Sequence, residues 1–109
     1  MKTALIALVL FVAGGAGVVG ADPVMIAGIG AKTCSYWIST PASKAEGEKW
    51  ALGFWSGLNY VAAVTKQQNQ LIIDPDRMLA EIGKMCTERP NQSLADSVWI
   101  TFLTLNKSQ

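Results

Sequence analysis

The sequence predicts an all-α fold: a small bundle of four helices, one short and three longer, closed by one disulfide. Apolar residues recur at intervals of three or four along several stretches, which is the period of a helix with one buried face. Capping residues precede these stretches, and no stretch alternates apolar and polar residues between hairpin turns as a strand would. We expect one helical domain over residues 33–109, preceded by a signal peptide over residues 1–21 and an irregular leader over residues 22–32.

The first 21 residues are typical of a cleaved secretory signal. Lys2 supplies a positive charge, residues 4–12 are an unbroken apolar run, and Val19 and Ala21 place short side chains before the cleavage point at Asp22. An uncleaved membrane anchor is the alternative, but the stretch is rich in glycine and no basic cluster follows it. We therefore expect a periplasmic protein with no stable membrane insertion after cleavage.

Export to an oxidising compartment favours a disulfide between the two cysteines. Cys34 and Cys86 are the only thiols, and in an oxidising compartment they most simply form one disulfide. The loop that this bond closes is about 50 residues long, which the chain-entropy model values at roughly 4 kcal/mol of stability. A redox-active pair is the alternative, but such pairs usually lie close together as Cys-x-x-Cys. We expect a structural bridge.

Two helices are expected in the first half of the domain. Thr33 is an N-cap for a short helix that ends before Pro41, because the residue preceding a proline avoids helical backbone. Ser43 and Glu46 then fit a capping box, which opens the longest helix over about residues 44–66.

Two further helices complete the bundle. Asp74 is an N-cap followed by a proline at the first helical position, and this helix is expected to reach about Cys86. Ser93 caps the last helix, whose apolar residues keep a helical period up to a frayed polar end.

Helical period also predicts which side chains are buried. The predicted core consists of Trp50, Phe54, Leu58, Val61, Met78, Leu79, Ile82, Val98, Trp99 and Phe102. Gly53 and Gly57 are spaced by one helical turn, which indicates the close approach of a neighbouring helix. Four tryptophans exceed what a small core can hide, so we expect Trp37 and Trp55 to be partly exposed anchors on a protein-binding surface.

Composition excludes several classes of function. The chain has no histidine, so Ser-His or Cys-His catalysis and zinc sites with imidazole ligands are excluded. Asp74 and Asp76 form a close carboxylate pair, which their place at a helix N-terminus explains. Nine Lys and Arg, one of them Lys2 in the signal, face eight Asp and Glu, so the mature chain is neutral and lacks the charge that binds nucleic acid. We predict a binding protein, not an enzyme, without catalytic residue, metal or cofactor.

Four segments follow one another along nearly the whole mature chain: residues 33–38 (TCSYWI), 51–58 (ALGFWSGL), 85–90 (MCTERP) and 94–96 (LAD). In the order and spacing of these segments, the chain resembles the HdeA/HdeB family of small periplasmic proteins. The resemblance implies one disulfide, a compact helical fold, often a homodimer, and acid-activated chaperoning of unfolded clients. The same layout is similar to the Rap1a/Tai family of periplasmic immunity proteins, which neutralise toxic effectors.

We therefore expect a small exported protein that acts by protein binding, in first place as an acid-stress binder of unfolded client proteins. At about pH 2 the carboxylates are protonated and the mature chain carries roughly +9 charge, so self-repulsion would loosen the fold and expose its apolar faces. Two alternatives stay open. One is an immunity or inhibitor protein that occludes a toxic enzyme, and the other is an accessory component of an envelope or secretion assembly.

Overall fold

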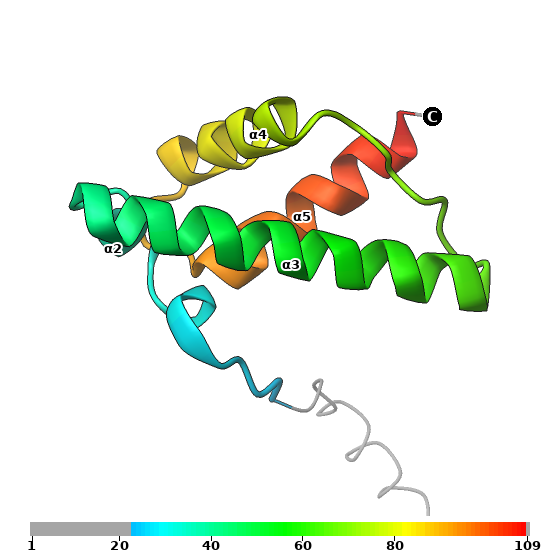
Figure 1. Ribbon diagram of the computed structural model, residues 1–109, viewed down its shortest axis with the longest axis horizontal. Helices are drawn as coiled ribbons and strands as arrows, with labels where there is room; N and C mark the ends of the chain where they lie inside the picture. Colours follow the sequence, from blue (N-terminus) through cyan, green and yellow to red (C-terminus); the bar gives the residue numbers. More distant parts are fainter. Residues whose placement is uncertain (1–22, 109) are drawn as a thin grey trace, which may run out of the picture.

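The computed structural model describes residues 23–108 and confirms the all-α fold class (Figure 1). The elements in chain order are the 3-10 helix η2 (Gly28–Ala31) and the helices α2 (Cys34–Trp37), α3 (Pro41–Thr65), α4 (Pro75–Glu88) and α5 (Leu94–Lys107). The predicted signal peptide over residues 1–21 lies outside the described residues. No helix between residues 23 and 108 has the length and apolar character needed to cross a bilayer.

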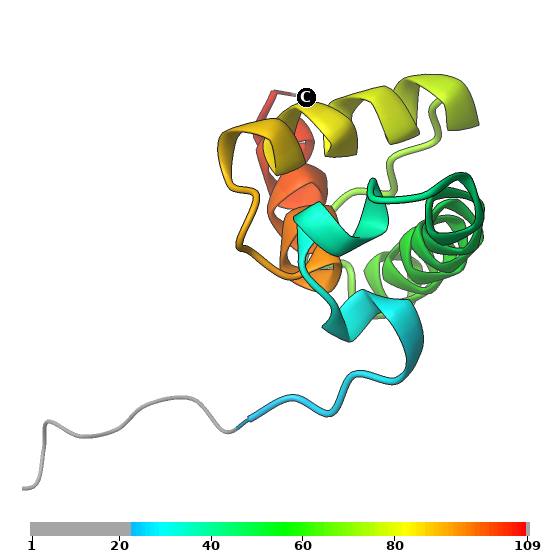
Figure 2. The same cartoon turned by 90° about the vertical axis from the view of Figure 1, so that its left-hand side faces the viewer.

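Helix α3 forms the long axis of the described chain, and the other helices gather on one side of it (Figures 1 and 2). Both α5 and η2 pack against α3, while α4 packs mainly on α5. The short helix α2 contacts all three long helices. Figure 1 shows α3 and α5 diverging toward their C-terminal ends. This divergence leaves part of the apolar surface of α3 uncovered.

Each α-helix begins with a side chain that accepts a backbone amide hydrogen bond. The predicted caps Thr33, Asp74 and Ser93 are confirmed. The capping box predicted to open the longest helix is wrong, because α3 begins at Pro41 and its cap is Thr40, whose hydroxyl accepts from the amide of Ser43 at 3.0 Å. Proline is favoured in a first helical turn, where its missing N–H has no partner to lose. Pro41 therefore starts α3.

The predicted disulfide between Cys34 and Cys86 is confirmed and ties α2 to the end of α4, with the two Cα atoms 5.2 Å apart. Backbone hydrogen bonds reinforce this junction, since the amide of Cys34 donates to the carbonyl of Gln92 at 2.8 Å and that of Leu94 donates to the carbonyl of Lys32 at 2.8 Å. The covalent link and these hydrogen bonds hold the start of α2 against the start of α5.

The predicted core is confirmed in part. Met78, Ile82, Val98 and Phe102 are buried. Four other predicted members are partly buried against this cluster: Trp50, Phe54, Leu58 and Leu79. The prediction that Val61 is in the core is wrong, because this residue is 54% exposed and lines a surface depression between α3 and α5.

The leader is more ordered than expected. Residues 28–31 form η2, and Ile29 and Gly30 within it are buried. Gly30 lies so close to the ring of Trp50 that a Cβ atom at this position would overlap the indole. Because Trp50 Nε1 also donates to the carbonyl of Ala27 at 2.9 Å, this tryptophan holds the leader on α3.

Candidate functional site

The two tryptophans expected on the surface are buried. Trp37 is 2% exposed and Trp55 is 1% exposed, so the prediction that they anchor a partner is wrong. Trp37 packs over Gly47, and its Nε1 donates to the carbonyl of Lys44 at 3.0 Å. Trp55 lies edge-on to Phe102 in the core. The absence of a side chain at Gly47 makes the room that Trp37 needs.

Trp99 is the tryptophan at the surface. It was expected in the core, yet it is 40% exposed, because the inner face of α5 is filled by Val98 and Phe102 and places Trp99 at its edge. Its ring stacks on Phe102 with centroids 6.3 Å apart and planes 11° from parallel. Trp37, Trp50 and Trp55 each donate their indole N–H to a backbone carbonyl, whereas Trp99 Nε1 has no partner among residues 23–108.

Trp99 stands where two depressions meet. One, with a volume of about 540 Å³, is lined by the leader, α3 and α5: Val24, Ile26, Ala31, Phe54, Ser93, Ala95, Asp96 and Trp99. The other, of about 310 Å³, lies where α3 and α5 diverge and is lined by Leu58, Val61, Ala62, Thr65, Gln67, Gln68, Trp99 and Phe102. We call the two together the Trp99 groove. Its walls are mainly apolar.

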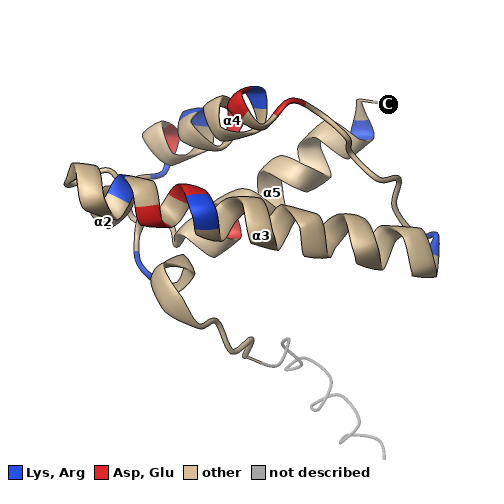
Figure 3. Cartoon of the chain, viewed as in Figure 1, with Lys and Arg blue, Asp and Glu red and all other residues tan. Residues whose placement is uncertain are grey.

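Most charged residues of the described chain lie away from this groove. In Figure 3, Lys, Arg, Asp and Glu cluster on the N-terminal half of α3 and on α4, while the C-terminal half of α3 carries none. Both ion pairs within residues 23–108 belong to these regions and join Lys44 to Glu48 and Lys84 to Glu81. Asp96 is the one charged side chain that lines the groove, and it forms neither of these pairs.

The outer face of α3 is also uncovered. Apart from the chain neighbours and the nearby backbone of α3 itself, no atom of the described chain comes within 4 Å of a Cβ atom built at Gly53 or Gly57. The expected close approach of a neighbouring helix at these glycines is therefore wrong within the described residues. Tyr60 and Val64, one turn and two turns further along this face, are exposed as well.

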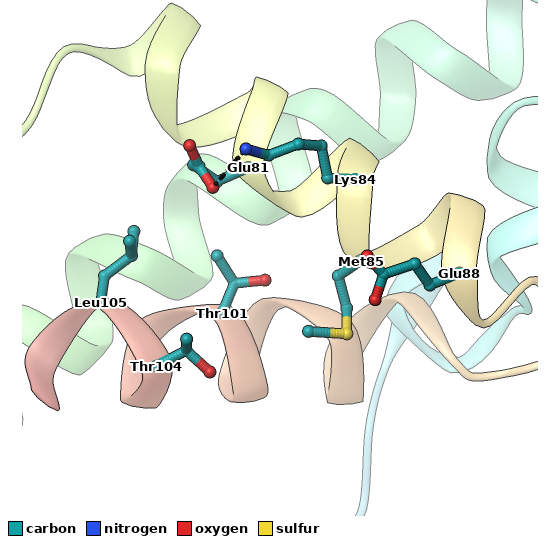
Figure 4. Close-up of a pocket in the computed structure, with 7 residues that line it drawn as sticks. All are labelled: Glu81, Lys84, Met85, Glu88, Thr101, Thr104 and Leu105. Atoms are coloured by element: carbon teal, nitrogen blue, oxygen red, sulfur yellow. Dashed lines mark ion pairs between the residues drawn. The ribbon is translucent and has the colours of Figure 1, made fainter. Parts of the chain in front are cut away.

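A depression of about 290 Å³ between α4 and α5 gathers other polar side chains (Figure 4). Glu81 and Lys84 point toward each other and pair at 3.2 Å, and the hydroxyl of Thr101 donates to the carbonyl of Ser97 at 2.7 Å. These groups are therefore engaged within the protein. Residues 23–108 contain no group of three or more potential metal ligands. We assign no reaction to this depression.

Comparison with protein-family models, with curated proteins and with solved structures found no match to this chain. The resemblance to the HdeA/HdeB family therefore stays a prediction. What the site can do follows from its geometry, which offers an apolar groove, an indole ring whose N–H has no acceptor among residues 23–108, and one acidic side chain.

Proposed function

We propose that this chain is an exported, disulfide-closed protein that binds a dedicated protein partner through the Trp99 groove while it is fully folded. The observation that carries the proposal is Trp99, a large aromatic side chain at the surface whose indole N–H has no partner among the described residues. Tryptophan is enriched at the energetic centres of protein interfaces, because it combines a large apolar area with a hydrogen-bond donor.

The surroundings of Trp99 support this role. The apolar walls of the groove lose water favourably when a partner covers them. The backbone hydrogen bond from Leu94 to Lys32 fixes the start of α5, which forms part of one wall. A preorganised surface loses little conformational entropy on binding. An immunity or inhibitor protein and an accessory component of an envelope assembly both need this kind of surface at neutral pH.

Acid-triggered release of apolar surface has less support. Among the four α-helices of the described residues, three caps are hydroxyl groups, namely those of Thr33, Thr40 and Ser93, and these keep the same protonation state in acid. Asp74 is the one carboxylate cap. The groove is open in the folded protein, so binding there requires no unfolding.

The test compares partner capture at neutral pH between the wild type and a matched pair of variants. Tagged wild-type protein is purified from periplasm at neutral pH, together with Trp99→Ala and, as control, Tyr36→Ala, whose aromatic ring is 47% exposed on α2. We expect one stoichiometric partner with the wild type and Tyr36→Ala, and its loss with Trp99→Ala. Thermal melts of all three proteins show whether the fold is intact.

Two results would refute the proposal. One is retention of the partner by a folded Trp99→Ala protein. The other is suppression of client aggregation at about pH 2 without any partner at neutral pH, which would restore the acid-chaperone hypothesis.

A further inference from the structure

The disulfide is enclosed by three helices. Helix α2 carries Cys34, α4 carries Cys86, and α5 brings the hydroxyl of Ser97 to 3.1 Å from Cys34 Sγ. Cys34 and Ser97 are 0% exposed and Cys86 is 3% exposed. A thiolate that attacks this bond would have to bring its charge into the core, which is unfavourable without water around it. Exchange with an external thiol therefore needs one of the three helices to move away.

Helix α5 is the wall that can leave while the bond is intact. The disulfide joins α2 covalently to α4, so these two helices cannot separate. The start of α5, residues 94–98, is held by noncovalent contacts only: the amide of Leu94 donates to the carbonyl of Lys32 at 2.8 Å, and Leu94, Ser97 and Val98 are buried. Proteins open locally at a lower free energy than they unfold globally. Opening of residues 94–98 is therefore the route that the geometry leaves to the sulfur atoms.

The same residues form a wall of the Trp99 groove. Ala95 and Asp96 line the larger depression of the groove, next to the cap residue Ser93. Ser97, on the other face of this part of α5, lies against the disulfide. Displacement of residues 94–98 therefore uncovers the sulfur atoms and takes this wall of the groove apart in one movement.

We propose that residues 94–98 are a gate over the disulfide, so that a dithiol reductant reaches the Cys34–Cys86 bond only while this part of α5, and with it one wall of the Trp99 groove, has left the junction. The inference goes beyond the proposed function, because it describes the chain without a partner. Closed, the gate keeps the oxidised protein oxidised in the presence of thiols.

The exchange has two steps. A thiolate of the reductant attacks one sulfur of the disulfide, a mixed disulfide forms, and the other cysteine leaves as a thiolate. The second thiol of the reductant then attacks the mixed disulfide, which releases the second cysteine and closes the reductant into a cyclic disulfide. Two electrons pass from the dithiol to the protein, and the thiolates of the protein equilibrate with protons from water.

The test uses two variants that each lose a hydroxyl cap. Ser93→Ala removes the cap of α5, which accepts from the amide of Asp96 at 3.0 Å, and Thr40→Ala removes the cap of α3, which accepts from the amide of Ser43 at 3.0 Å. Each oxidised protein is treated at neutral pH with dithiothreitol, in the range where the rate is proportional to its concentration. Free thiols are trapped with iodoacetamide and counted by mass spectrometry. Hydrogen exchange of the Leu94 amide, followed by NMR, measures the opening of the gate independently.

We expect the wild type to be reduced far more slowly than oxidised glutathione, whose disulfide no fold protects. Ser93→Ala should raise both the reduction rate and the exchange rate of the Leu94 amide about fivefold, as the loss of a cap provides. Thr40→Ala should change neither rate. The reduction rate of the wild type should rise less steeply with urea than global unfolding does, because a local opening exposes less surface.

Several results would overturn the inference. Equal acceleration by both variants, or a urea dependence as steep as that of global unfolding, would show that exchange passes through the unfolded chain. Faster exchange of the Leu94 amide in Ser93→Ala without faster reduction would show that another wall opens. Reduction of the wild type at the rate of oxidised glutathione would show that no gate exists.

Discussion

Adding one methyl group at Gly47 should destabilise the protein, although glycine is a poor residue for the interior of a helix. A Cβ atom at Gly47 would overlap Trp37 Cδ1 and lie 2.5 Å from Trp37 Nε1. Ordinary contact begins at 3.4 Å and Cδ1 lies closer than Nε1, so the ring would have to retreat by at least about 0.9 Å. Trp37 is buried, and its Nε1 donates to the carbonyl of Lys44 at 3.0 Å, so this retreat disturbs both the packing and the hydrogen bond.

The size of the effect follows from three contributions. Overpacking a core costs about 1–3 kcal/mol, and weakening the indole hydrogen bond costs about 0.5–1.5 kcal/mol. The helix gains about 1 kcal/mol when alanine replaces glycine. We therefore expect Gly47→Ala to lose about 0.5–3.5 kcal/mol in the free energy of unfolding. For a domain of this size that lowers the melting temperature by roughly 10 °C.

The same helix contains the matched controls. A Cβ atom at Gly53 or Gly57 meets no atom within 4 Å, so Gly53→Ala and Gly57→Ala keep the helical gain without a clash. Each should raise stability by about 0.5–1 kcal/mol. Thermal and urea unfolding, followed by circular dichroism of the oxidised protein, measures all three variants. If Gly47→Ala melts at the temperature of the two controls, Trp37 does not pack as described.

Three other perturbations have definite expected outcomes. Reduction of the disulfide, or Cys34→Ala with Cys86→Ala, should lower the free energy of unfolding by about 4 kcal/mol in urea titrations, and an unchanged midpoint would contradict a structural bridge. Thr40→Ala should lower the free energy of unfolding by about 1 kcal/mol. Ser43→Ala should lower it less, because the hydroxyl of Thr40 is the cap. Equal losses of the two variants in thermal melts would contradict this assignment. At about pH 2 the near-ultraviolet circular dichroism should keep its folded signature, and its loss would favour acid activation.

Local chemistry explains why three of the four caps could be predicted. A cap and the amide that it accepts from lie within three residues of each other, as Ser93 and Asp96 do, so the sequence contains both partners. Thr40 was missed because Pro41 is compatible with two interpretations. It disfavours helical backbone at the residue before it, and it is also favoured in the first turn of a new helix. A capping side chain followed by proline predicted the start of α4 at Asp74. The same pattern at Thr40 and Pro41 would have predicted the start of α3.

The helical periodicity of the sequence alone could not predict which tryptophans are buried and which are exposed. Trp50, Phe54 and Trp55 are neighbours on α3, and this helix carries apolar residues around much of its circumference. Which of them is covered depends on where the leader and the connection after α3 cross the helix. Those crossings are tertiary contacts fixed by Trp50 with Ala27 and by Trp55 with Leu71, and no spacing in the sequence encodes them. Trp99 was misplaced for the same reason, since it lines a depression between α3 and α5 that the sequence does not reveal.

The chemistry of the caps bears on how this protein would respond to acid. The capping box expected at Ser43 and Glu46 would have made the start of the longest helix depend on a carboxylate. With Thr40 as the cap, that dependence is removed, and acid acts on the fold mainly through Asp74, the two surface ion pairs and the net charge. Surface ion pairs contribute little to stability, and the disulfide limits expansion of the chain at any charge. These features support the proposed binding at the Trp99 groove of the folded protein over apolar surface released by acid.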